Sequence, residues 1–89
     1  MGLEYKIETY DRARTEWQKL LQHRQEFLYE EEGTYHLGLS REHLFISVKE
    51  EAEYIYLCQH VACTESDALM GLLIRRLLSL NDHLVISEL

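Results

Sequence analysis

The chain has 89 residues and a mass of 10.6 kDa, enough for one small domain spanning residues 1–89. Lys and Arg number 9 against 16 Asp and Glu, so the net charge is −7 with neutral histidines. This acidic balance argues against DNA and disfavours RNA as partners, because affinity for nucleic acids comes mainly from neutralising phosphates. No apolar run is long enough to span a bilayer and no secretion signal opens the chain, so we expect no membrane partner and a cytoplasmic location.

A change in hydrophobic period separates the first two predicted elements. Residues 3–9 alternate apolar and polar side chains, which is typical of a half-buried strand. Apolar residues then recur at helical spacing as far as Leu28, which predicts an amphipathic helix of about five turns. Thr9 or Asp11 is the expected N-cap, and the helix is expected to end in residues 30–33, where Gly33 suits a left-handed position.

Three short alternating runs follow, at residues 34–40, 44–49 and 54–61. Their β-branched and aromatic side chains favour strands, and the polar joints between them are short enough for hairpins. A competing interpretation is a helix within residues 41–62, capped by Ser40, which would make the chain mainly α.

The last two predicted elements are a second helix and a closing strand. The helix is expected to begin with Thr64 or Ser66 as its N-cap and to end at residues 81–82, before a strand over residues 83–87. The element order is then β-α-β-β-β-α-β. It predicts an α+β fold: a two-layer sandwich of a mostly antiparallel sheet with two helices on one face.

The second helix is apolar around nearly its whole circumference. Four leucines supply the stripe that a helix needs on a one-layer core, namely Leu69, Leu72, Leu73 and Leu77. Met70, Ile74 and Leu78 lie off that stripe, so either the closing strand and first helix cover them or they form a partner surface. On the second interpretation Arg75 lies at the rim, and the partner is a second copy of the chain or a different protein.

Aromatic residues favour a second contact surface on the sheet face away from the helices. That face is expected to carry Phe45, Tyr54, Tyr56 and His60. Such a platform can stack RNA bases, but the surrounding acids favour a protein partner that contacts Tyr54 and Tyr56. Cross-strand packing without any partner is the alternative.

The spacing Cys58-x-His60-x-x-Cys63 is the only pattern of ligand or nucleophile type that stands out. It suggests an alternative function, a zinc-stabilised or thiol-dependent protein, although both cysteines are expected as free thiols. Our leading prediction contains no catalytic residue, cofactor or metal. It is a small acidic protein-interaction module (an adaptor, an inhibitor or immunity-type binder, or a chaperone-like module) that self-associates through its second helix.

Overall fold

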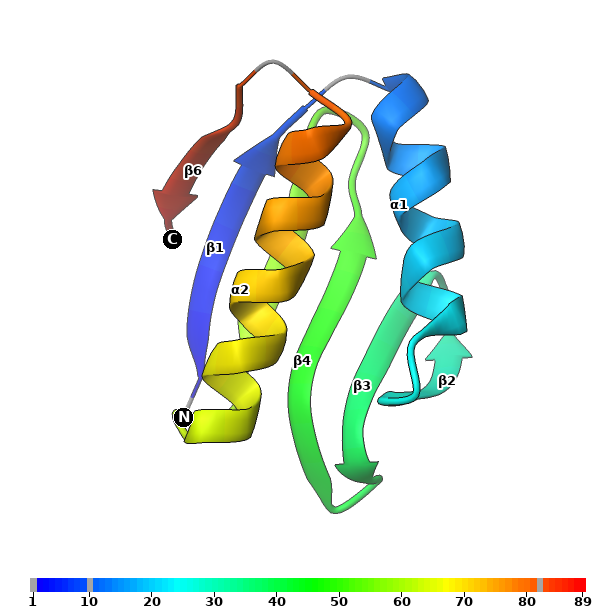
Figure 1. Cartoon of the computed structure of the whole chain (residues 1–89), viewed down its shortest axis with the longest axis vertical. Coiled ribbons are helices and arrows are strands. Elements are labelled where there is room, and N and C mark those ends of the chain that lie inside the picture. The colour runs from blue at the N-terminus through cyan, green and yellow to red at the C-terminus, as the bar shows by residue number, and fades with distance from the viewer. Residues whose placement is uncertain (1, 10, 82) are drawn as a thin grey trace.

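The computed structural model of the protein describes residues 2–9, 11–81 and 83–89, with side chains described for all of these except residues 11–14. The elements are β1 (Leu3–Glu8), α1 (Asp11–His23), β2 (Phe27–Glu31), β3 (Thr34–Ser40), β4 (His43–Glu50), β5 (Ile55–Gln59), α2 (Thr64–Ser79) and β6 (Val85–Glu88). The strands form one antiparallel sheet in the order β2-β3-β4-β5-β1-β6, and both helices lie on the same face of it (Figure 1). The α+β prediction is confirmed, with one strand more than expected.

The core fills the space between the helices and one sheet face. Strand residues directly opposite one another share a face, and the pairs Ile7 with Ile55 and Val48 with Leu57 are buried. From the helices, the fully or almost fully buried side chains are Trp17 and Leu21 on α1 and Leu69, Leu73 and Leu77 on α2. These apolar side chains form one continuous cluster, which fixes both helices on the sheet.

The first helix is shorter than predicted. It ends at His23, and the segment that we expected to complete it forms β2, the edge strand that pairs with β3. Glu32 and Gly33 both have positive φ, 51° and 80°, as a two-residue hairpin turn of type I′ requires. Gly33 therefore adopts the predicted left-handed conformation in a hairpin rather than at a helix end.

The competing helix within residues 41–62 is wrong, because β4 and β5 occupy that part of the chain. Phe45 is also not on the open sheet face, since it is buried within the core cluster. The reason is a β-bulge: Leu37 pairs with Ile46 and Gly38 with Leu44, which leaves Phe45 as the extra residue of β4.

The predicted caps differ from the observed helix ends. Cys63 occupies the N-cap of α2, whereas Ser66 is buried and accepts a hydrogen bond from the Gln59 side chain at 3.0 Å. Thr9 donates to the Asn81 side chain at 2.7 Å, which ties the end of β1 to the end of α2. The side chain of Asp11, our other candidate cap, and residue Asp82 lie outside the described set.

Candidate protein-interaction surface

The structure leaves one flank of α2 incompletely covered. Three of the four predicted stripe leucines are buried, and Leu72 is half-buried. Met70 and Ile74 are half-buried and pack at the border of the core, whereas Leu78 is 44% exposed and Arg75 is exposed. The apolar circumference of this helix is therefore not fully enclosed by its own chain.

Met70, Ile74 and Leu78 recur every four residues, so they form one row along α2. In Figure 1, α2 runs upward in front of the sheet, with β1 and β6 on one side and α1 on the other. Each residue of this row directly follows a buried leucine of the stripe that faces the sheet, and successive residues of an α-helix are rotated by about 100°. Because the helix is right-handed and runs upward in this view, that rotation turns the row toward β1 and β6. The row therefore overhangs the end of the sheet that neither helix covers.

The sheet beneath that row is also partly open. Leu3 lies opposite Gln59, whose side chain bonds to α2, so Leu3 belongs to the helix-covered face, yet it is 45% exposed. Ile86 lies opposite the buried Ile7 and shares that face, yet it is 43% exposed. We call the set Leu3, Met70, Ile74, Leu78 and Ile86 the apolar edge.

The last strand ends the sheet with backbone groups that have no strand beside them in the part of the chain that the structure describes. The amide of Leu89 donates to the Glu4 oxygen at 2.9 Å, which makes this pair a hydrogen-bonded one. Bonding alternates along an antiparallel ladder, so Ser87 and Val85 also face β1, whereas the N–H and C=O groups of Ile86 and Glu88 point outward. All four residues of β6 are exposed.

The opposite end of the sheet is protected. The edge strand β2 carries exposed Glu30 and Glu31, with Glu32 in the adjoining turn, and a register shift interrupts its pairing between Phe27 and Tyr29. Charges and bulges are the usual devices that keep an edge strand from pairing with another chain. The segment Val85–Glu88 has neither a bulge nor a cluster of charges. The β6 edge therefore lacks the protection against pairing with another chain that the β2 edge has.

Tyr54 and Tyr56 lie elsewhere. Tyr56 is opposite Lys6 and Lys49, on the face away from the helices, and its hydroxyl donates to the Glu4 carboxylate, a bond that raises the pKa of Tyr56. The ring of Tyr54 lies 5.3 Å from the Lys6 ammonium. The structure thus places Tyr56 on the other sheet face from α2, whereas Leu3 and Ile86 share the helix-covered face with the α2 residues.

The open sheet face holds a polar network. The sequence analysis placed His60 on this face but did not predict that it shares a partner with another histidine. Ser47 is buried and lies 2.7 Å from His36 Nδ1 and 2.7 Å from His60 Nε2. His36 stacks on Tyr29 with ring centroids 4.5 Å apart. Burial lowers the pKa of both histidines, which favours neutral rings. The alternation of polar residues along β3 and β4 and at the end of β5 was the available signal, but the strand order was needed to join them.

The cysteine pattern does not converge on one site. The Cys58 sulfur lies 3.9 Å from His60 Nδ1, whereas Cys63 occupies the N-cap position of α2, where its side chain makes no capping hydrogen bond. Burial raises the pKa of the Cys58 thiol, which disfavours the thiolate that a nucleophile or zinc ligand needs. Among the described residues, no three His, Cys, Asp or Glu side chains are grouped so that they could hold a metal ion.

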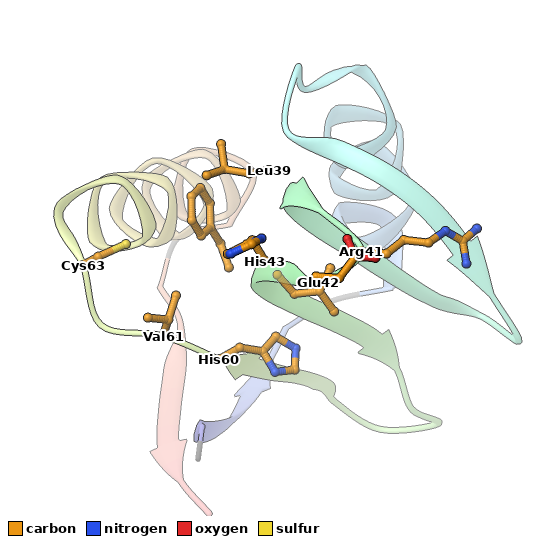
Figure 2. A pocket seen from close by; sticks show the side chains of 9 residues that line it. Leu39, Arg41, Glu42, His43, His60, Val61 and Cys63 are labelled. Atoms are coloured by element: carbon orange, nitrogen blue, oxygen red, sulfur yellow. The ribbon is translucent and has the colours of Figure 1, made fainter.

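A hollow of about 510 Å³ lies between the β3–β4 turn and the segment that joins β5 to α2. Figure 2 shows Leu39 and His43 near one another, with His60, Val61 and Cys63 along the segment after β5, while the Arg41 side chain extends away from them. Leu39 is 72% exposed at its rim. The lining mixes apolar, imidazole and charged groups, with no arrangement that selects one class of ligand.

Comparison with known proteins identifies no relative: no protein-family model, no curated protein and no solved structure matches this chain. No helix within the described residues is long and apolar enough to cross a membrane. Function is therefore inferred from the surface of the chain itself.

Proposed function

We propose that this chain is a small, acidic, non-catalytic protein-interaction module of the cytoplasm, and that it associates with a second copy of itself through α2. The exposed Leu78, at the end of a half-buried row on α2, together with the open Leu3 and Ile86 on the helix-covered face of the sheet, is the observation that carries the proposal. An apolar set of this kind at one rim of a small domain is typical of an interaction site. Two free thiols, Cys58 and Cys63, are consistent with a reducing compartment.

A second copy fits this surface because identical surfaces related by a twofold axis bring the same apolar side chains together. Covering Leu78, Leu3 and Ile86 would remove from water three large apolar side chains, each 43–45% exposed. The net charge of −7 opposes association elsewhere on the molecule, so the contact is expected where acids are sparse. Adaptor, inhibitor and chaperone-like roles all remain consistent with such a module.

A matched pair of substitutions tests the proposal. Leu78→Glu introduces a charge into the apolar edge, and Leu39→Glu makes the same change at the even more exposed Leu39 on β3. Light scattering at high micromolar concentration should show that Leu78→Glu is a monomer, while Leu39→Glu keeps the mass of the parent dimer. A parent dimer that Leu78→Glu leaves intact would contradict a role for this flank of α2. Circular dichroism of both variants checks that each remains folded.

A further inference from the structure

We propose that two copies of this chain pair through β6, antiparallel and with Ile86 of each copy opposite the partner's Ile86, so that the two sheets become one continuous sheet. This inference rests on the proposed self-association and specifies its geometry. A twofold axis perpendicular to the sheet keeps both α2 helices on the same face and places Ile86 at the centre of the seam.

The backbone of β6 determines the kind of partner. Ile86 and Glu88 direct their N–H and C=O groups away from β1, as the Leu89–Glu4 bond establishes. An extended strand presents donors and acceptors at the same alternating spacing, so it is the protein element that pairs directly with such a sheet edge. The occupant of this edge is therefore a strand rather than a helix or a small molecule.

Charge and register favour a second β6 over a second β2. Pairing two β2 strands would bring Glu30 and Glu31 of both copies to one seam, whereas β6 carries a single acid, Glu88. With Ile86 opposite the partner's Ile86, the residues whose N–H and C=O groups point away from β1 lie opposite one another and can form hydrogen bonds. In this register Glu88 lies opposite the partner's Leu84. No acid then faces an acid across the seam.

Apolar burial adds to the backbone bonds. Strand pairs are marginal on their own in water, and β6 has only four residues. Ile86 lies on the helix-covered face of β6, at the edge of the sheet, and is 43% exposed, so pairing packs the Ile86 side chains of the two copies against each other on that face. Val85 and Ser87, on the other face, lie opposite each other across the same seam.

Cross-linking through single new cysteines tests the register. In this geometry the two Ile86 Cα atoms lie within disulfide range, whereas the two Ser87 Cα atoms are more than about 7 Å apart. Mild oxidation of Ile86→Cys should give a covalent dimer on a non-reducing gel. Ser87→Cys and the parent protein, whose Cys58 and Cys63 are the internal control, should not. A dimer cross-linked through Ser87→Cys but not through Ile86→Cys would overturn the proposal.

A second pair of variants tests the outward backbone bonds. Glu88→Pro removes the outward N–H, while Glu88→Gln removes the charge and keeps that N–H. Sedimentation should show the dimer dissociation constant raised at least about tenfold by Glu88→Pro and not raised by Glu88→Gln. If the parent dimerises but Glu88→Pro has no effect and Ile86→Cys gives no cross-link, strand pairing is wrong and self-association stands. If the parent is monomeric, both proposals fail.

Discussion

Trp17 on α1 donates a hydrogen bond from its indole Nε1 to the main-chain oxygen of Leu73 on α2, at 3.0 Å, and both residues are buried. The two helices are thus joined by a directional bond as well as by apolar packing. Because Leu73 lies on the buried stripe of α2, this bond also helps to fix which flank of α2 remains open. The orientation of the apolar edge therefore depends on a residue of the opposite helix.

Trp17→Phe keeps an aromatic ring in the core and removes the indole donor. We expect the free energy of unfolding to fall by about 1–3 kcal/mol, from the lost hydrogen bond and the smaller ring. Urea denaturation followed by far-ultraviolet circular dichroism measures the change. An unchanged unfolding midpoint would show that the indole contributes nothing to holding the helices together.

The bulge that buries Phe45 depends on Gly38. A Cβ at this position would lie 2.8 Å from Leu44 Cα and 2.9 Å from Phe45 N, both backbone atoms that cannot move aside cheaply. Gly38→Ala should lower the free energy of unfolding by about 2–3 kcal/mol. The matched change Gly71→Ala meets no atom within 4 Å, on an exposed part of α2, and should raise it by about 0.5–1 kcal/mol. Thermal melting that ranks the two variants in the opposite order would contradict this interpretation.

The β2–β3 turn contains a residue that is poorly suited to it. Glu32 has φ 51°, a left-handed conformation that costs an ordinary side chain about 1–2 kcal/mol and that Asn adopts more easily. Glu32→Asn creates the Asn-Gly pair preferred in such turns and should stabilise the protein by about 0.5–1 kcal/mol. Gly33→Ala, at φ 80°, should destabilise it by about 1 kcal/mol. Equal melting temperatures for the parent and both variants would rule out a role for turn conformation.

The network around Ser47 predicts a loss of stability in mild acid. Burial lowers the pKa of His36 and of His60; for His36, Glu31 opposes this effect and Arg41 adds to it. Below a pH of about 6.5 these histidines are therefore protonated to a greater extent in the unfolded chain than in the folded chain. As the pH is lowered from there toward the lowered pKa values of the folded state, the free energy of unfolding decreases. Ser47 has one hydroxyl hydrogen, which finds no acceptor in the pair once both rings are charged.

Urea unfolding at about pH 7.5 and about pH 5.5 measures that loss. His60→Gln removes one of the two titrating rings, so it should reduce the difference between the two conditions. Equal stability of the parent at both values would mean that the two rings titrate normally. The carboxylate of Glu26 does not affect the comparison. Burial raises its pKa, but the hydrogen bonds that it accepts and the charge of Arg24 together outweigh burial and lower the pKa overall, so its effect lies at lower pH.

The fold was predictable where the spacing of apolar residues matches the secondary structure of the whole element. On α2, the spacing of Leu69, Leu73 and Leu77 identifies the buried stripe without any knowledge of the sheet. The segment Phe27–Glu31 failed this test because Phe27 continues the helical spacing of Trp17 and Leu21. Pairing with β3 outweighs that local pattern, and the turn at Glu32 and Gly33 was the available sign of a hairpin.

The candidate surface was only half predictable, for a different reason. Met70, Ile74 and Leu78 follow from helical geometry, but Leu3 and Ile86 join them only because β1 pairs with both β5 and β6. Strand order depends on contacts between distant parts of the chain, which periodicity does not encode. The same limit applies to Ser47, whose two histidine neighbours are His36 on β3 and His60, directly after β5.

Sedimentation equilibrium of the unmodified protein across the micromolar range is the most direct measurement of whether the apolar edge is an interface. An average mass that rises with concentration from 10.6 kDa toward twice that value is the expected result. A mass that stays at 10.6 kDa up to high micromolar concentration would show that Leu3, Leu78 and Ile86 remain in water, and would contradict self-association.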